Sequence, residues 1–335
     1  MKIRSVLSII VLPLILISCD YNIAGSNSMP QDMNEKIRVY IAERNARGES
    51  IDLKGSFGRN LRGLKLKNLD LSNSDLSEVD LSHAQFSRVS LNKVNLSKAR
   101  LISAVIQESD LSQAVLNSTN FIKSDLQASS FEKAEINEAN FIKATLDDAN
   151  FSTAIIKNTS FEEASIFNAR FAGSDMSNIS FKGSNLSGAD LQSSKLENAY
   201  FFGTDLTATN FQNTVIKNSF FESSDISNSD FSNAIITNTH MKKLIANNTN
   251  FNKVNIQNLD FTGSAFSGAE FQKSNINAAN FTDSNLTDCN FEGAKLQGAK
   301  FTNASILGGL FNNTEIVNCD FSTAKIKDTQ IPGIK

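Results

Sequence analysis

The sequence predicts an all-β solenoid with four sides, and three observations lead to that architecture. From Leu61 to Ile331 every fifth residue is large and apolar, and Ala246 is the one departure. The residue two before each of these positions is usually small, most often Ala, Ser or Thr. The large residues in steps of ten from 121 to 321 are nearly all Phe, whereas those between them are aliphatic. Such regular repetition is typical of a chain that stacks identical short units.

A five-residue period fits neither a helix nor a straight strand. On an α-helix, steps of five spread the apolar residues round the whole surface. On a straight strand, an odd step sends successive apolar residues to opposite faces. A chain that turns a corner once per repeat avoids both problems, because each short extended segment then points its large residue and the small one two before it into a shared interior. The remaining two residues of each unit are rich in Ser, Asn, Gly, Lys and Glu, which suit a corner.

The alternation of Phe with aliphatic residues indicates the number of sides. A coil of 20 residues stacks Phe on Phe and aliphatic on aliphatic, whereas a three-sided coil of 15 would stack them alternately. Like-on-like stacking is the simpler arrangement and favours four sides. We therefore expect two opposed Phe ladders, interrupted at Leu191 and Met241, and two opposed Ile/Leu ladders that contain Phe266.

The individual units also resemble a known family. Residues 74–78, 189–193 and 279–283 read Ser-Asp-Leu-Ser-Glu, Ala-Asp-Leu-Gln-Ser and Ala-Asn-Phe-Thr-Asp. They are similar to units of the pentapeptide-repeat family, whose pattern is Ala, Asp or Asn, Leu or Phe, and two variable residues. The resemblance implies that family's right-handed quadrilateral β-helix over residues 61–335. The stability of such a rod is a sum over neighbouring coils.

Residues 1–18 are predicted to be a lipoprotein signal peptide. Lys2 and Arg4 precede an apolar run that is too short to span a bilayer. The run ends in a tetrapeptide that resembles the bacterial lipobox: Leu16, Ile17, Ser18 and Cys19. The resemblance implies that Cys19 takes a diacylglyceryl group and becomes the new N-terminus, with palmitate among its acyl chains. The alternative is an ordinary secretory signal with an incidental cysteine.

A lipid-modified N-terminus predicts the location of the protein. An anchor with more than one acyl chain holds a protein stably on a bilayer. We expect a protein of the cell membrane that faces the periplasm or the exterior. Asp20 resembles an inner-membrane retention signal of some Gram-negative bacteria. Residues 19–31 are polar and are interpreted as a flexible tether.

Residues 32–60 are predicted to form an N-terminal capping helix and a transition into the rod. Apolar residues recur there at helical spacing: Met33, Ile37, Tyr40 and Ile41. Asp32 and Glu35 are expected to form a capping box, and Gly48 to end the helix. We interpret the helix as a lid over the first coil, because solenoids need a cap with a polar outer face; the alternative is a partner-binding helix. Residues 51–60 form the transition.

Few places in the rod break the pattern. Leu64 and Leu69 are large where a small residue is usual, which indicates an adapted first coil beneath the lid. Leu244 and Ala246 exchange large for small, which a packed interior tolerates. The last repeat is followed by Pro332 and three further residues, so the final coil has no covering helix. Its exposed edge leaves end-to-end association with a second copy as an open hypothesis.

The sequence shows no catalytic, cofactor or metal constellation. His83 and His240 are eight coils apart, and the acidic residues are spread at repeat spacing along outward positions. Cys289 and Cys319 occupy inward small positions one and a half coils apart, so we expect two buried free thiols. Nothing in the sequence argues for an enzyme.

Charge and export together favour one function over another. The net charge is −3, so the chain is not basic and nucleic-acid binding is not expected. The leading hypothesis is a membrane-tethered, non-enzymatic binding or scaffold protein of the cell envelope. It would use the lipid bilayer as anchor and an envelope protein or a glycan as partner. The alternative, which the family resemblance brings, is a DNA-mimicking protein that binds and protects gyrase, and it requires an N-terminus that is not exported.

Overall fold

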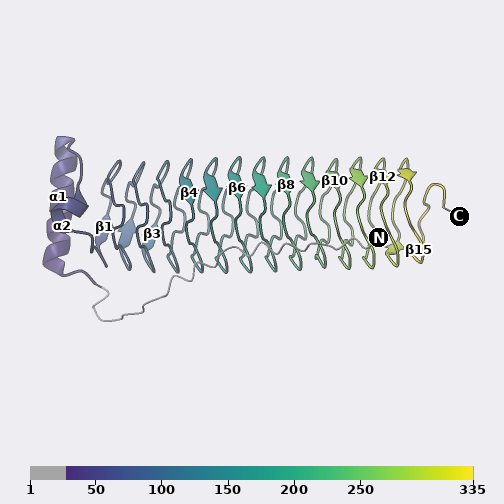
Figure 1. The fold of residues 1–335 in the computed structure, drawn as a ribbon, viewed down its shortest axis with the longest axis horizontal. Coiled ribbons are helices and arrows are strands. Elements are labelled where there is room, and N and C mark those ends of the chain that lie inside the picture. The colour runs from purple at the N-terminus through teal and green to yellow at the C-terminus, as the bar shows by residue number, and fades with distance from the viewer. Residues whose placement is uncertain (1–27, 335) are drawn as a thin grey trace, which may run out of the picture.

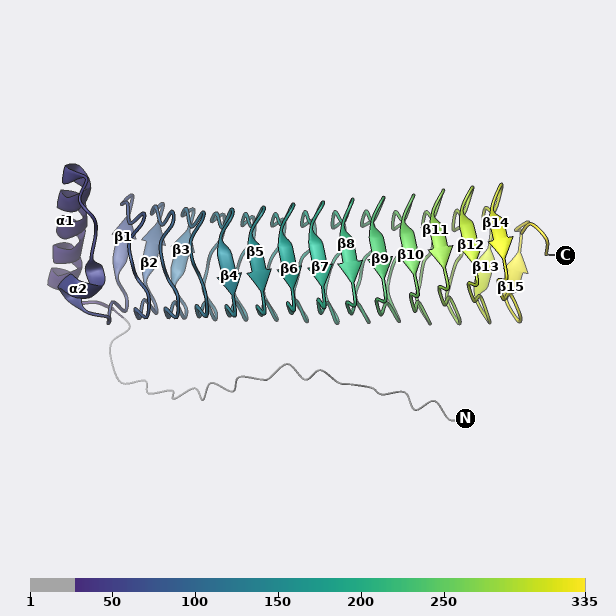
Figure 2. The same cartoon turned by 45° about the horizontal axis from the view of Figure 1, so that its top comes forward.

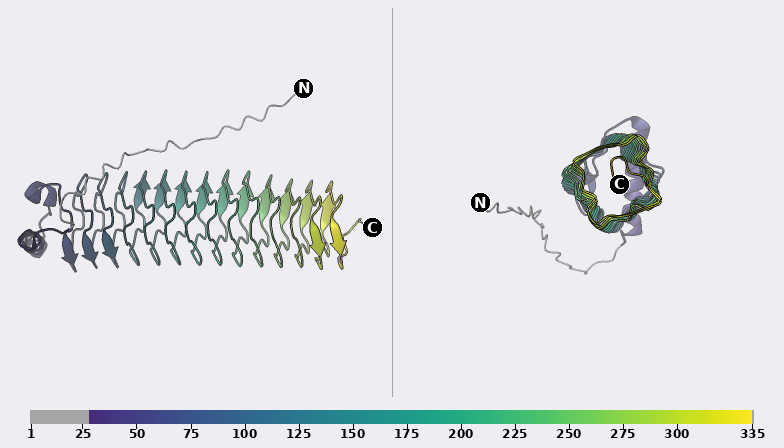
Figure 3. Two further views of the ribbon diagram at one scale, coloured as in Figure 1. Left: turned by 90° about the horizontal axis from the view of Figure 1, so that it is seen from below. Right: turned by 90° about the vertical axis from the view of Figure 1, so that its right-hand side faces the viewer.

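The protein is a straight rod with two helices at one end (Figure 1). The computed structural model describes residues 28–334 of the chain. Helix α1 spans Gln31–Arg47 and helix α2 spans Leu53–Phe57. All later residues wind into stacked coils, which superimpose into a roughly four-sided outline when the rod is viewed along its length (Figure 3).

The strands are short and lie in rows along the rod (Figure 2). Each is three residues long and parallel to its neighbour, and the pairing of Lys65 with Gln85 shows that one coil contains 20 residues. Isolated bridges with the same spacing, such as Asn60 with Asp80, connect the remaining faces. The strands are β1 Lys65–Lys67, β2 Gln85–Ser87, β3 Val105–Gln107, β4 Glu135–Asn137, β5 Ile155–Lys157, β6 Asp175–Ser177, β7 Lys195–Glu197, β8 Val215–Lys217, β9 Ile235–Thr237, β10 Asn255–Gln257, β11 Asn275–Asn277, β12 Lys295–Gln297, β13 Ser305–Leu307, β14 Glu315–Val317 and β15 Lys325–Lys327. The expected quadrilateral β-helix with a short N-terminal helix is confirmed.

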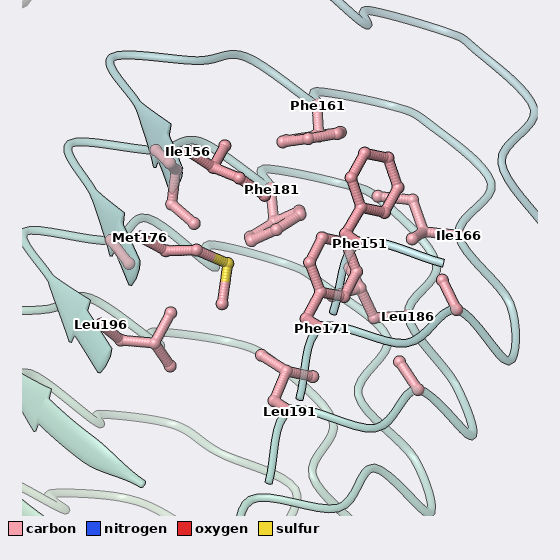
Figure 4. Close-up of a cluster of buried hydrophobic side chains, with 14 of the residues drawn as sticks. Phe151, Ile156, Phe161, Ile166, Phe171, Met176, Phe181, Leu186, Leu191 and Leu196 are labelled. Atoms are coloured by element: carbon pink, nitrogen blue, oxygen red, sulfur yellow. The ribbon is translucent and has the colours of Figure 1, made fainter. Parts of the chain in front are cut away.

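Stacked rings fill the interior. Within one ladder, the rings of Phe131 and Phe151 lie parallel with their centroids 4.5 Å apart. Across the bore, Phe141 meets Phe151 edge-on at 6.2 Å. Figure 4 shows Phe151 and Phe171 from one ladder beside the aliphatic side chains of the adjacent faces. Because parallel and edge-on contacts are both favourable ring geometries, two Phe ladders fill the bore with few voids.

The small inward residues complete this packing. Many are Ser or Thr, and their buried hydroxyls donate to backbone carbonyls, as Ser124 does to Phe121 at 2.7 Å and Thr119 to Leu96 at 2.8 Å. Burying a hydroxyl costs little free energy when the hydroxyl donates a hydrogen bond to an acceptor. Ser and Thr therefore serve at this position as well as Ala.

Each corner contains a residue in the left-handed backbone conformation, and many corners also have an Asp or Asn side chain that accepts a backbone hydrogen bond. At every fifth position from Gly63 to Gly333 the angle φ is positive. Gly and Asn adopt this conformation at least cost, which explains their abundance there. Many outward Asp and Asn side chains accept a hydrogen bond from the backbone N–H two residues later, as Asn185 does from Ser187 at 2.9 Å. This hydrogen bond, here called the corner bond, holds the turn.

Helix α1 covers the open edge of the first coil. Its Ile37 and Ile41 side chains are fully buried. Asn34 accepts a hydrogen bond from the Lys65 backbone N–H at 2.7 Å, and the Asn45 amide donates to the Asp70 carbonyl at 3.0 Å. The helix therefore shields the interior and also occupies polar groups of a strand edge that would otherwise be free to pair with another chain.

The predicted capping box is wrong, whereas the predicted end of the helix is confirmed. Helix α1 begins at Gln31, after Pro30, and no side chain caps its N-terminus. Asp32 thus lies inside the first turn, too late to cap it, and Glu35 pairs with Arg38 at 3.0 Å instead. At the other end Gly48 adopts φ 66°, and its N–H bonds the last carbonyls of the helix.

The exchange of large and small residues at Leu244 and Ala246 is a local repacking. Both side chains are buried, and the backbone bond from Ala246 to Ala265 keeps the regular spacing between coils. One coil beyond Ala246 lies Phe266, whose ring meets Phe261 edge-on at 5.1 Å. The small Ala246 thus leaves room for the Phe266 ring in a ladder whose other residues are mostly aliphatic. In the first coil, Leu64 is fully buried and Leu69 partly buried beneath the lid.

The far end of the described rod carries partly exposed apolar side chains. Ile326 and Ile334 are 36% exposed there. Together with Phe311, Ile331 and Pro332 they line a shallow pocket of about 620 Å³.

Candidate functional site

The predicted lipidation site lies outside the described residues. Leu16, Ile17, Ser18 and Cys19 all belong to residues 1–27, as does most of the predicted tether. Within residues 28–334, no helix has both the length and the apolar character needed to cross a bilayer.

The titratable groups in the described part of the rod do not gather into a reactive site. His83 is half-buried, and His240 is exposed, with its imidazole 4.0 Å from the Glu222 carboxylate. Residues 28–334 contain no group of three or more His, Cys, Asp or Glu side chains that could hold a metal ion.

The two cysteines of the rod, Cys289 and Cys319, differ in burial more than the repeat pattern predicts. Cys289 is a buried free thiol, as expected, and burial raises its pKa well above the usual range. Cys319 is also free but only half-buried, so the expectation of two buried thiols is wrong for this residue. Within residues 28–334 no coil stacks on the far side of its position, and shielding along a solenoid comes from the neighbouring coil.

The feature of the surface that stands out is a stack of three rings. Tyr200, Phe220 and His240 are outward residues of three successive coils, joined by parallel bridges. The Tyr200 and Phe220 ring centroids are 4.8 Å apart with the planes 8° from parallel, and those of Phe220 and His240 are 5.0 Å apart with the planes 6° from parallel. We call these three residues the aromatic ladder. Its rings stand on the surface because the outward position alternates with the two inward ones.

Further apolar side chains surround the aromatic ladder. Phe202 follows Tyr200 on the adjoining corner and is 50% exposed, and Ile235 and Ile245 on the two adjacent faces are 44% and 46% exposed. Exposed apolar residues grouped in this way are typical of interaction surfaces.

Charged groups border the aromatic ladder at its C-terminal end. Lys242 and Asp260 form an ion pair at 3.1 Å. Partial burial works to raise the pKa of Asp260, but hydrogen bonds from Thr262 and Lys242 outweigh it and lower the pKa. Asp260 therefore stays ionised at neutral pH.

Polar groups border the other end. On the corner that precedes this face, Asn158, Asn178 and Asn198 form an amide ladder: Asn198 donates to Asn178 and Asn178 to Asn158, both at 3.0 Å. One coil before Tyr200, the Ser180 hydroxyl donates to the Glu162 carboxylate at 2.9 Å.

The aromatic ladder interrupts the corner bonds of its own face. Before it, Asn140 accepts such a bond from Ile142, and after it Asp260 accepts one from Thr262. Aromatic residues have no carboxylate or amide oxygen to take that role. Three successive coils thus lack a bond that stabilises the turn.

Sequence reasoning missed this ladder, although the signal was present. The alternation of Phe with aliphatic residues reveals the 20-residue coil through inward positions, whereas the ladder appears only when outward residues are compared at the same 20-residue step. At that step Tyr200, Phe220 and His240 follow one another.

Comparison with known proteins agrees with the repeat pattern. A family model described as "Pentapeptide repeat region" matches residues 64–141 and 254–335, and another described as "Pentapeptide repeats (8 copies)" matches residues 134–171, 164–203 and 204–242. No curated protein matches the chain.

Several solved structures are similar in part. A trypsin-treated variant of QnrB1, a plasmid-mediated fluoroquinolone resistance protein, is 19% identical, with 56% of this chain and 89% of that chain covered and a TM-score of 0.44. HetL, a pentapeptide-repeat protein involved in heterocyst differentiation regulation from the cyanobacterium Nostoc, is 20% identical. The match covers 88% of this chain and 96% of HetL, with a TM-score of 0.19. The A-module of the mannuronan C-5 epimerase AlgE6 from Azotobacter vinelandii is 8% identical. The match covers 94% of this chain and 99% of the A-module, with a TM-score of 0.35.

The family assignment rests on the repeats themselves. The two models together account for residues 64–242 and 254–335, which include most of the rod. This chain belongs to the family of pentapeptide-repeat proteins.

Proposed function

We propose that this protein is a membrane-tethered, non-enzymatic binding module of the bacterial cell envelope. The observation that supports a binding role is the aromatic ladder, in which Tyr200 and Phe220 are half-buried and His240 is exposed, with the exposed Phe202 beside it, because aromatic side chains on a rigid scaffold are typical of recognition surfaces. The interior is filled by stacked side chains, so the outer faces are the surfaces that a partner contacts. The tether is supported by the lipobox resemblance that ends at Cys19.

The lipid anchor is tested by metabolic labelling with a palmitate analogue. Cells that express the wild type, Cys19→Ala or Cys319→Ala are labelled and fractionated. We expect label and membrane association in the wild type and in Cys319→Ala, the matched control with a half-buried thiol, and loss of both in Cys19→Ala. A wild type that is unlabelled and cytoplasmic would refute the tether, and binding to gyrase would then be the function to measure.

The open end of the rod supports a second contact, with another copy of the chain. Ile326 and Ile334 expose apolar surface there, and with Phe311, Ile331 and Pro332 they line the pocket at the end of the described rod. We propose end-to-end self-association through this surface. Light scattering at high protein concentration should give a mass above that of the monomer for the wild type and a monomer for Ile326→Lys; a monomeric wild type would contradict it.

A further inference from the structure

The aromatic ladder ends in an uncovered ring face. Among the described residues, the Tyr200 ring has one ring neighbour, Phe220, which lies one coil later. One coil earlier the corresponding residue is Ser180, whose short side chain is directed to Glu162. A serine does not cover a phenol ring. One face of Tyr200 therefore remains available to a flat ligand.

Hydrogen-bonding groups lie beside that ring face. The amide ladder runs past Ser180 and Tyr200, because Asn178 and Asn198 each precede them by two residues. Each amide carries two N–H donors, and the contact to the next Asn uses one of them. The Glu162 carboxylate accepts from Ser180 and keeps further acceptor sites. Donors and acceptors thus border an apolar platform.

This combination matches the chemistry of a sugar. A pyranose ring has C–H groups on its faces and hydroxyls round its rim, so one ring both stacks on Tyr200 and exchanges hydrogen bonds with the amide ladder and Glu162. An aromatic side chain of a protein would use the ring face but leave these polar groups unpaired. The rim of this surface carries charge of both signs, because the exposed Lys182 follows Ser180 by two residues, one coil after Glu162. We infer that this surface binds a glycan, with one sugar ring stacked on the free face of Tyr200.

The coils that carry the aromatic ladder lack the corner bonds that stabilise other coils of the same face. Three successive outward positions hold aromatic residues in place of the Asp and Asn that make corner bonds elsewhere on the same face. Places where a sequence breaks its own local rule are expected at functional sites. The inference rests on the proposed function only in that the rod is a binding module, because sugar binding does not require the lipid.

The experiment measures binding of chitotetraose and cellotetraose to the purified full-length chain by saturation-transfer NMR and calorimetry. Tyr200→Ala should weaken binding about tenfold by removing the stacking platform. Asn178→Gly should weaken it about threefold by removing an amide. That corner residue has φ 52°, which Gly adopts readily, so the fold is kept. Phe167→Ala is the matched control, because the Phe167 side chain is 45% exposed on another corner. This variant should bind both sugar probes with the affinity of the wild type.

Three results would overturn the inference. They are a wild type that binds neither probe at millimolar concentration, equal affinity in Tyr200→Ala and the wild type, and equal losses in Phe167→Ala and Tyr200→Ala. Circular dichroism of each variant establishes that a loss is not due to unfolding. Cys19→Ala should bind sugar like the wild type, so a failed tether and a failed sugar site give different results.

Discussion

Replacement of Phe151 by Ala tests how the interior holds the rod together. The Phe151 ring is fully buried, lies parallel to Phe131 at 4.5 Å and Phe171 at 4.8 Å, and meets Phe141 and Phe161 edge-on at 6.2 and 5.9 Å. Removing a buried Phe side chain lowers the free energy of unfolding by about 3–5 kcal/mol. We expect a loss in this range from urea unfolding. Hydrogen exchange should localise the lost protection to the coils beside residue 151, because solenoid coils contact only their neighbours.

The matched control is Phe151→Leu. Leu191 already occupies a position in the same ladder and is fully buried, so the ladder accepts this side chain. The loss of stability should be smaller than for Phe151→Ala. A loss below about 1 kcal/mol in the alanine variant, or lost protection spread evenly along the rod, would refute a nearest-neighbour interior.

Three further predictions concern the corners and the lid. Thr153 is β-branched at φ 58°, so Thr153→Asn should raise the free energy of unfolding by about 1 kcal/mol, as measured by urea titration. Asn34→Ala removes the acceptor for the Lys65 N–H and should cost about 1 kcal/mol, visible as faster hydrogen exchange in α1. Partial burial works to raise the pKa of Asp75, but hydrogen bonds from Lys54 and Ser77 outweigh it and hold the pKa at about 2. The ion pair of Lys54 with Asp75 therefore stabilises the lid above about pH 4, and this contribution is lost as the pH falls towards 2. The melting temperatures of the wild type and Lys54→Met should converge over that pH range.

The interior could be predicted from the sequence because the repeat constrains it directly. A step of five sets the corners, and the Phe phase sets the coil length, so both follow from residues that point inward. The corner conformation explains the variable positions as well: Asn and Gly are frequent there because φ is positive.

The ends of the rod could not be predicted in the same way. Cys319 and Cys289 occupy equivalent positions in the repeat, yet they differ in burial because, within residues 28–334, a following coil stacks on Cys289 and none on Cys319. At the lid, Asp32 has the sequence pattern of a cap, but Pro30 precedes the helix and shifts its start. The contacts of Asn34 and Asn45 with the first coil depend on how the helix lies across it. Each of these properties depends on a neighbour that the repeat pattern does not specify.

The outward positions are variable in the repeat, but the residues there affect the stability of the fold. Asp and Asn are common there because they hold the corner, so a departure from them removes a stabilising hydrogen bond while leaving the interior unchanged. In the aromatic ladder three departures occur one coil apart, and their rings stack on one another. The stacking of the rings partly offsets the stability lost with the missing corner bonds. Asp or Asn at these positions would add a corner bond, and the proposed binding role accounts for the three rings that stand there instead.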